Sequence, residues 1–443
     1  MNGSILGKMF SSFQIIITGF LAVILFGTLM LMLPFSSKDG SWTTLMDALF
    51  TSASAVCVTG LVVRDTALYW SAFGQAVILV LIQIGGLGII TVTAFIAMVS
   101  GRRISLLQRS MLQESLSAHQ VGGLVKMTSF IFKVVFITEA AGAAVMLPTF
   151  CKEYGAEGVW MSVFHSVSAF CNAGFDLMGT HSGEFGSLTY FAGRAGIVIP
   201  VMLLIVTGGI GFLTWHDMAE NRFAFRKYKM QTKTILTVTG ILIIVPAVLF
   251  FFNDFADAPF GKRLLLSLFQ AVTPRTAGFN TTDIGEMTGA GRAVTVILML
   301  IGGAPGSTAG GLKVTTIAVL AANAAAVIRR KKSPDLYGRR IEDQTAETAS
   351  ALLMMYLFLS FAAAMAISMI ETLPFEKCIF ETASAIGTVG LSLGITAGLG
   401  TVSRLILIIL MFLGRVGGLT LMYAALSVEA NVSRYPVEKI NVG

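Results

Sequence analysis

Charged side chains are scarce in this sequence: they make up only 12% of its 443 residues, whereas 55% are hydrophobic. A soluble globular domain carries about 25% charged residues, so the composition, with a mean hydropathy of +0.80, excludes an ordinary soluble fold. Cysteine and histidine are rare as well, with four of each. Their spacing contains no C-x-x-C pair and no cluster, which argues against a metal centre.

The apolar residues gather into long runs, and a run of about 20 residues is enough to cross a bilayer. The first run is too long for the core of a signal peptide and lacks a small-residue cleavage site, so we interpret it as a retained span. The sequence thus predicts an all-α integral membrane protein with eight transmembrane helices. The eight runs cover residues 12–34, 71–99, 126–149, 190–215, 234–253, 293–328, 348–370 and 402–428.

The net charge of +7 indicates topology and not nucleic-acid binding. Lysine and arginine concentrate in the connections after the second, fourth and sixth runs, while acids are frequent in the others. The positive-inside rule places these basic connections in the cytoplasm, together with both termini. The basic residues are Arg102, Arg103, Arg109, Lys126, Arg222, Arg226, Lys227, Lys229, Lys233, Arg329, Arg330, Lys331, Lys332, Arg339 and Arg340.

The outer connections contain an internal repeat. Each has an apolar stretch too short to cross a membrane, and each stretch ends at a glycine that is followed by Leu or Phe. Three of the four contain Ser-Ala at the same offset, whereas the third has Val272-Thr273 and then Pro274. The segments are FTSASAVCVTGL (50–61), FHSVSAFCNAGF (164–175), LFQAVTPRTAGF (268–279) and FETASAIGTVGL (380–391).

These segments predict four pseudo-symmetric repeats around one central pore, each with an outgoing helix, a re-entrant pore loop and a returning helix. We place the repeats at 1–100, 101–218, 219–332 and 333–443, the third with a broken second helix. A glycine pair in each returning run supports the alignment. The pairs are Gly85-Gly86, Gly208-Gly209, Gly302-Gly303 and Gly417-Gly418.

The matched glycines suit a ring of backbone carbonyls that replaces the hydration shell of a K⁺ ion. Glycine reaches positive φ without a Cβ penalty and leaves a narrow axis clear. The short helix before each glycine can also aim the negative end of its dipole at the pore. The predicted selectivity filter is Val58, Thr59, Gly60, Asn172, Ala173, Gly174, Thr276, Ala277, Gly278, Thr388, Val389 and Gly390.

The sixth run contains a stretch rich in helix breakers, for which we expect an unwound loop that obstructs the pore below the filter. Arg415 lies near the centre of the eighth run, where an isolated charge is costly, so it should face the pore or the carbonyls of this loop. Lys313 is either interfacial or functional. The predicted gate is Arg415 with Gly302, Gly303, Ala304, Pro305, Gly306, Ser307, Thr308, Ala309, Gly310 and Gly311.

Arg275 stands three residues before the third glycine, where the other repeats have Cys57, Cys171 and Gly387. A cation lining the pore would repel the substrate, so we expect Arg275 to point behind the filter and pair with an acid such as Asp283 or Glu286. We expect the two cysteines to serve packing.

Taken together, the motifs resemble the Trk/Ktr/HKT superfamily of K⁺ transport proteins, and within it the bacterial KtrB-type membrane subunit. The resemblance covers nearly the whole chain. It rests on SAVCVTGL (54–61), SAFCNAGF (168–175), TPRTAGFN (273–280), SAIGTVGL (384–391), GGAPGSTAGGLKVTT (302–316) and GRVGGLT (414–420).

This resemblance implies potassium uptake across the bacterial plasma membrane by a channel-like homodimer with one pore per subunit. It also implies K⁺ selectivity from Gly60, stimulation by Na⁺, and a cytoplasmic ring of KtrA-like, RCK-type regulatory subunits. ATP or ADP would bind that partner, because this chain has no nucleotide motif and we expect no cofactor in it. We expect the basic connections and the tail at 434–443 to dock the ring or to bind anionic lipid.

Two other functions agree with a multi-pass chain. A secondary carrier with alternating access would also contain discontinuous helices, although carriers often have inverted repeats and these are parallel. A membrane anchor for a partner would give no flux at all. Cation flux in liposomes separates a passive pore from both.

Overall fold

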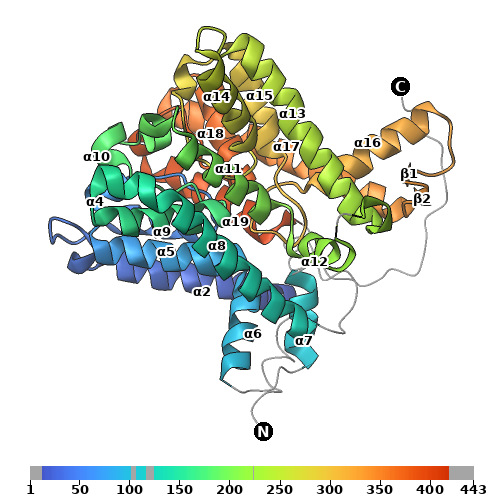
Figure 1. Ribbon diagram of the computed structural model, residues 1–443, viewed down its shortest axis with the longest axis horizontal. Helices are drawn as coiled ribbons and strands as arrows, with labels where there is room; N and C mark the ends of the chain where they lie inside the picture. The colour runs from blue at the N-terminus through green and yellow to red at the C-terminus, as the bar shows by residue number, and fades with distance from the viewer. Residues whose placement is uncertain (1–11, 101–105, 116–123, 223, 419–443) are drawn as a thin grey trace.

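The computed structural model describes residues 12–100, 106–115, 124–222 and 224–418, and helices dominate it (Figure 1). Four helices are long and apolar enough to cross a membrane, and each opens one of four similar units along the chain. They are α2 (Ser12–Met32), α8 (Leu124–Tyr154), α13 (Met230–Asn253) and α17 (Asp343–Glu371).

Each long helix is followed by a shorter one that packs against it and is largely buried towards its C-terminal end. The short helices end in the segments that the sequence predicts as pore loops. They are α3 (Leu45–Val56), α9 (Glu157–Phe170), α14 (Phe260–Val272) and α18 (Phe375–Gly387).

The returning segments are not straight helices, and two of the predicted spans are each bent into a pair of helices. Sharp bends of 98° and 95° divide the second and fourth apolar runs into helix pairs. The bends fall at Gly88 and Gly211, whose φ angles are 82° and 89°, a region that glycine reaches without strain. The pairs are α5 (Ala72–Leu87) with α6 (Ile89–Val99), and α11 (Ala195–Gly209) with α12 (Phe212–Asn221).

The third returning segment is interrupted as well, and the fourth is described only as far as Gly418. In the third, α15 (Gly289–Leu300) and α16 (Val314–Ile328) are separated by non-helical residues that include 302–311, as its Pro and Gly content predicts. In the fourth, α19 (Thr401–Val416) ends at Gly417, with φ of 90°. Residues 419–428 of the eighth apolar run lie outside the described residues.

In three of the returning helices, a close backbone contact explains why one position is occupied by glycine. A Cβ on Gly85, Gly208 or Gly414 would lie only 2.1, 2.0 or 2.1 Å from a carbonyl oxygen of the preceding short helix. In the fourth unit the matching residue is therefore Gly414, not the Gly417-Gly418 pair that the sequence suggested. Residues without a Cβ let the returning helix lie directly against the end of the short one.

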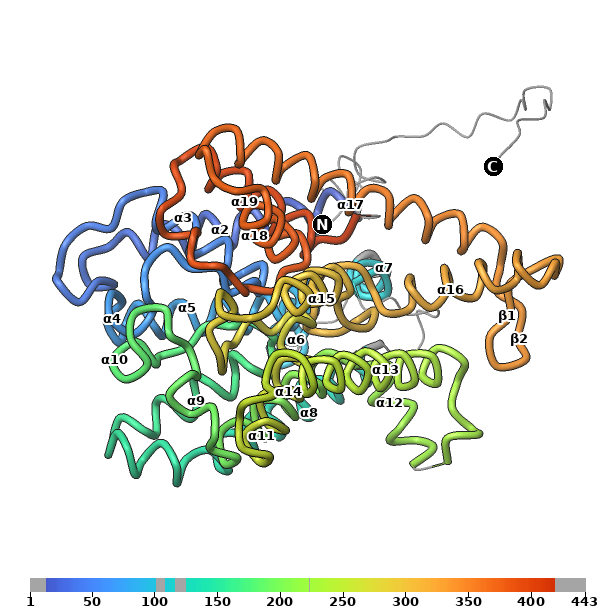
Figure 2. The backbone as a smooth tube through the Cα atoms, turned by 90° about the horizontal axis from the view of Figure 1, so that it is seen from above, coloured from blue at the N-terminus to red at the C-terminus, as the bar shows by residue number. Residues whose placement is uncertain are grey.

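The end of α16 and the start of α17 project from the remaining elements and are joined by a small hairpin (Figure 2). This hairpin pairs β1 (Asp335–Leu336) with β2 (Arg339–Arg340). Arg102, Arg103 and the tail at 434–443, which belong to the predicted docking face, lie outside the described residues. The remaining short elements are η1 (Pro34–Ser36), α4 (Thr66–Tyr69), α7 (Leu106–Ser115), α10 (Gly179–Ser182), η2 (Ser187–Phe191), η3 (Phe225–Lys227), η4 (Ile284–Glu286) and η5 (Thr396–Gly398).

Candidate functional site

Four loops with the same backbone conformation follow the short helices, and we call 58–60, 172–174, 276–278 and 388–390 the glycine loops. In each loop the first residue and the glycine both have positive φ. The values at the glycines are 88°, 70°, 79° and 96° for Gly60, Gly174, Gly278 and Gly390. The first residues are Val58 (56°), Asn172 (58°), Thr276 (68°) and Thr388 (52°).

The glycine loops form a closed ring in chain order. A Cβ placed on each glycine would collide with the carbonyl oxygen just before the next glycine, so each loop lies against its successor. The distances are 2.5 Å from Gly60 to Ala173 O, 2.7 Å from Gly174 to Ala277 O, 2.3 Å from Gly278 to Val389 O and 2.3 Å from Gly390 to Thr59 O. Residues from all four units, far apart in sequence, therefore surround one axis.

Hydroxyl groups of the short helices hold the glycine loops in this conformation. The amides of Gly60 and Gly390 donate to Ser54 Oγ and Ser384 Oγ at 3.1 and 3.0 Å. Ser168 donates to the carbonyl of Phe175 at 2.7 Å. These are the serines of the repeated Ser-Ala pair. In the divergent third unit Thr273, one position later, donates to Phe279 O at 2.6 Å.

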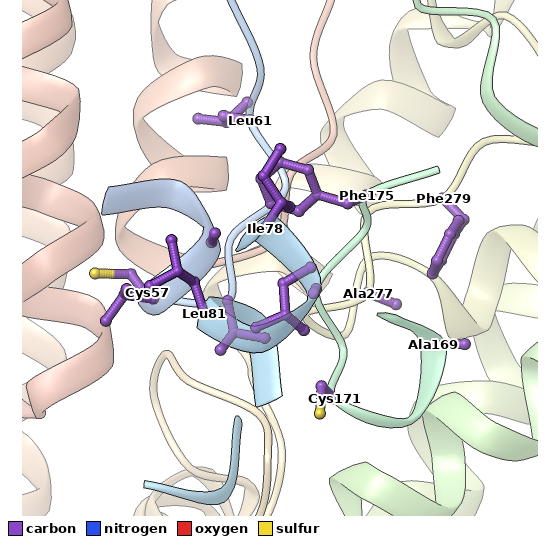
Figure 3. Close-up of a cluster of buried hydrophobic side chains, with 14 of the residues drawn as sticks. Cys57, Leu61, Ile78, Leu81, Ala169, Cys171, Phe175, Ala277 and Phe279 are labelled. Carbon is purple, nitrogen blue, oxygen red and sulfur yellow. The ribbon is translucent and has the colours of Figure 1, made fainter. Parts of the chain in front are cut away.

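An apolar cluster backs the first and second glycine loops (Figure 3). Cys57 and Cys171 belong to it, and both are free thiols with fully buried side chains. A Cβ on Gly86 would lie 2.7 Å from Cys171 Sγ, so the thiol fills the space between α5 and the end of α9. This position agrees with the packing role expected for the cysteines.

On one side of the ring the four glycines open into a cavity of about 150 Å³ whose lining includes Asp65 and Asp176. Asp65 accepts from the amides of Ala67 and Phe185, each at 2.9 Å. Burial, reinforced by the nearby Asp65 charge, raises the pKa of Asp176 to about 7 against a hydrogen bond from Met178 N. The cavity is therefore lined by carboxyl groups and by the backbone of the glycine loops.

On the opposite side, residues 302–311 pass close to the start of the fourth glycine loop. A Cβ on Gly310 would lie 2.2 Å from Thr388 Oγ1. Backbone hydrogen bonds fasten this segment to the second unit, from Ala304 N to Gly209 O at 2.8 Å and from Thr308 N to Gly208 O at 3.3 Å. A further bond runs from Gly311 N to Gly414 O at 3.2 Å in the fourth unit.

Hydrogen bonds from Arg415 connect residues 302–311 to the first unit. Its guanidinium donates to the carbonyls of Thr308 and Gly85, and to that of Gly86 at 3.0 Å. The expected carbonyl acceptors are thus present, one in the 302–311 segment and two at the end of α5. Lys313 Nζ donates to Ala309 O at 2.8 Å, so this lysine is also bound to the 302–311 segment.

Arg275 points behind its glycine loop, but the predicted acidic partner was wrong. Its guanidinium donates to Thr239 Oγ1 on α13 at 3.3 Å, and it forms no ion pair among the described residues. Asp283 instead accepts from Gly285 N at 2.8 Å. Arg275 turns towards α13 because the loop packs its side chain, only 6% exposed, against that helix.

Beyond residues 302–311 lies a larger cavity of about 1030 Å³, lined in part by Lys313, Arg415 and residues of α16 and α17. The two cavities are thus separated by the glycine loops and by this segment. Chemically, the arrangement offers backbone carbonyls around an axis, with carboxyl groups at one end and the partly buried cations Arg415 and Lys313 at the other. The sequence places Asp65 and Asp176 in two acidic connections, but it did not show that they line one cavity, because they follow two different glycines by five and two residues.

Known proteins resemble this chain over its whole length. Residues 4–433 match the TrkH family model, described as a cation transport protein. The chain is 38% identical over 450 residues to the potassium/sodium uptake protein NtpJ of Enterococcus hirae, covering 98% of both chains. It is 37% identical over 438 residues to the Ktr system potassium uptake protein B of Bacillus subtilis, covering 97% of this chain and 96% of that protein.

A solved structure supports the fold independently. The potassium transporter TrkH from Vibrio parahaemolyticus matches with a TM-score of 0.74, covering 95% of this chain and 86% of the other. At 19% identity this likeness establishes architecture alone. Together with the family match it confirms the resemblance that the glycine motifs suggested. The chain therefore belongs to the TrkH family of cation transport proteins, and it is a multi-pass membrane protein and not an enzyme.

Proposed function

We propose that this chain takes up K⁺ through a channel-like pore whose selectivity filter is the ring of glycine loops. The observation that carries the proposal is the contact of each loop glycine with the carbonyl before the next glycine. Four carbonyls at one level can replace the hydration shell of a K⁺ ion. The names of the relatives from Enterococcus hirae and Bacillus subtilis, both potassium uptake proteins, favour K⁺ as the substrate.

The surroundings of the ring fit a cation path. The short helices α3, α9, α14 and α18 end at the glycine loops, so their dipoles bring partial negative charge there. Asp65 and Asp176 add carboxyl groups on the outer side. This attraction is partly screened by salt, but it raises the local cation concentration at the entrance.

The gate in this proposal is the 302–311 segment held by Arg415. The segment lies against the inner end of the filter, since Gly310 contacts Thr388. It is fixed to the other units by a small number of hydrogen bonds, and Arg415 and Lys313 place two cations beside it. Movement of this segment would open a route from the filter to the larger inner cavity.

The architecture that follows has eight transmembrane helices in four repeats, at 1–100, 101–218, 219–332 and 333–443. Six of the eight spans are supported by four long helices and two bent pairs. We place the chain in the bacterial plasma membrane with both termini cytoplasmic, because of the basic connections.

The regulation belongs to the same proposal. The chain would form a homodimer on a KtrA-like ring that binds ATP or ADP, with Na⁺ as an activator. The name of the Bacillus subtilis relative, a subunit "B" of a Ktr system, supports a system of several components.

The experiment is cation flux through the purified chain in liposomes, comparing wild type with Gly60→Ser, Gly174→Ser, Gly278→Ser and Gly390→Ser. We expect passive K⁺ flux in the wild type and a lower K⁺/Na⁺ ratio in the variants, since each added side chain enters the carbonyl ring. Gly240→Ser is the control, because a Cβ there meets nothing within 4 Å. Unchanged K⁺/Na⁺ selectivity in all four variants would refute the filter. In the wild type, saturable exchange would indicate a carrier, and the absence of flux would indicate a membrane anchor.

A further inference from the structure

One acidic side chain lies in the middle of a long apolar helix and has no part in the pore described above. Glu139 occupies the centre of α8, and only 6% of it is exposed. Gln83 Nε2 of α5 donates to its carboxyl oxygens at 3.1 and 3.4 Å. Cys171 Sγ, at the end of α9, lies 3.6 Å from Gln83 Oε1 and 4.0 Å from Glu139 Oε1.

The internal repeat shows that the fold itself does not require a carboxyl group here. In three units a hydroxyl eight residues before the loop glycine donates to a backbone carbonyl of the long helix. Ser166 donates to Glu139 O at 2.6 Å. Ser52 donates in the same way to Ile24 O at 2.7 Å, and Thr382 to Ser360 O at 3.0 Å. Glu139 thus corresponds to an isoleucine and a serine, so the repeated contact needs only the backbone.

Gln83, the partner of Glu139, also has apolar residues at the matching positions of other units. Gln83 precedes Gly85 by two residues, and the matching residues before Gly208 and Gly414 are Val206 and Phe412. A carboxyl and an amide therefore replace apolar residues at the same junction between the first and second units. Placing such groups in a membrane interior is costly, and this cost has to be offset by a function.

The carboxyl group has no ion-pair partner. No Lys, Arg or His side chain of the described residues forms an ion pair with Glu139, and the Cys171 thiol lies 4.0 Å from Oε1. It also lies beside the C-terminal end of α9, where the helix dipole is negative. Both conditions disfavour a carboxylate and favour a carboxyl group that retains its proton.

The contacts of Glu139 and Gln83 connect them to the second glycine loop and to the residues that bind Arg415. Cys171 directly precedes Asn172, the first residue of the second glycine loop, and is the C-cap of α9. On α5, Gln83 lies two and three residues before Gly85 and Gly86, whose carbonyls accept from Arg415. A change at Glu139 would therefore act on the filter and on the anchor of the 302–311 segment, through two neighbouring contacts.

We propose that Glu139 is a positioning residue for ion selectivity: as a neutral carboxyl group paired with Gln83, it holds the second glycine loop against α5 through Cys171. The inference rests on the proposed function, because selectivity is assigned to the glycine loops. Neither Glu139 nor Gln83 touches the permeating ion. Their effect is to keep Asn172 and its loop in register with the neighbouring loops.

The test measures the K⁺/Na⁺ flux ratio of the full chain in liposomes for Glu139→Gln, Glu139→Ile, Gln83→Val and the double variant Glu139→Ile/Gln83→Val. The isoleucine and the valine are the residues that the matching units carry. Glu139→Gln should keep the wild-type ratio, because the amide is neutral and nearly isosteric. The two other single variants should lower it by about two- to tenfold, the range that one buried hydrogen bond supports.

The double variant should lose no more than either of these single variants, since both remove the same contact. Ile24→Val, at the matching position of the first unit, is the control and should leave the ratio unchanged. An unchanged ratio in Glu139→Ile or Gln83→Val, or an equal loss in Glu139→Gln, would overturn the proposal. If Glu139→Ile does not insert, Gln83→Val and Glu139→Gln decide alone. Gly174→Ser distinguishes a failure of the Glu139 proposal from a failure of the proposed filter. If Gly174→Ser also leaves selectivity unchanged, the filter assignment itself is wrong.

Discussion

Replacing Arg415 by alanine tests the proposed gate most directly. The side chain makes one hydrogen bond to the 302–311 segment, at Thr308 O, and two to the end of α5, at Gly85 and Gly86. Alanine removes all three bonds and one partly buried positive charge from the inner end of the proposed filter. None of the three bonds is to a glycine loop, so the proposed filter should retain its geometry.

The magnitude follows from what still holds the segment in place. A hydrogen bond from a charged group contributes about 1.5–3 kcal/mol, and only the bond to Thr308 joins Arg415 to the segment. The bonds to Gly208, Gly209 and Gly414 remain. The closed arrangement should therefore weaken by about one to two powers of ten relative to the open one, without becoming disordered.

The assay is K⁺ flux through liposomes that contain the purified chain without a regulatory partner, with insertion and monodispersity checked first. We expect flux to rise by about tenfold or more at an unchanged K⁺/Na⁺ ratio. Arg415→Lys is the matched control, because it keeps the charge and loses the planar fork of donors. Its K⁺ flux should therefore lie between those of the wild type and Arg415→Ala. Shortening the segment around 306–310 should raise flux as well. Normal or lower flux in folded, inserted Arg415→Ala and shortened variants would show that the segment is structural.

Three further outcomes follow from the same contacts. Gly208→Ala should markedly lower the thermal midpoint, because its Cβ would lie 2.0 Å from Phe170 O, whereas Gly240→Ala meets nothing within 4 Å and should not. Since burial raises the pKa of Asp176 from 3.8 to about 7, its ionisation destabilises the fold as pH rises through that window. Asp176→Asn should thus raise the midpoint at about pH 8 and leave it unchanged below about pH 4. Neutralising the four basic residues at 329–332 should reduce co-purification with a cytoplasmic ring, and undiminished recovery would place docking elsewhere.

The parts of the fold that could be predicted from the sequence are those that depend on the residue types within a short segment. Long apolar runs gave the outgoing helices, and the repeated glycines located four loops whose glycines do have positive φ, as at Gly60 and Gly390. The breakers between Gly302 and Gly311 predicted an unwound segment. In each case one residue type has a backbone consequence that does not depend on its neighbours.

What could not be predicted depends on contacts between distant residues. The bends at Gly88 and Gly211 occur inside uniformly apolar runs, so hydropathy gives no sign of them. Positive φ at Val58 is set by the hydrogen bonds that close the loop, and valine itself does not favour it. The partner of Arg275 was wrong because Asp283 is close in sequence, whereas the loop directs the guanidinium to Thr239 on another helix.

The differences between the four units are more informative about control than their similarities. A ring of matched carbonyls requires the units to agree only at the glycine loops and at the close contacts behind them, such as those of Gly85 and Gly208. Elsewhere a polar residue in one unit has an apolar counterpart in another, so its cost in the membrane cannot be ascribed to the shared fold. Arg415 is one such residue, and it connects the first and fourth units to a loop of the third. Because a contact between units can bias all of them at once, we expect the regulation of this pore to depend on such unit-specific residues.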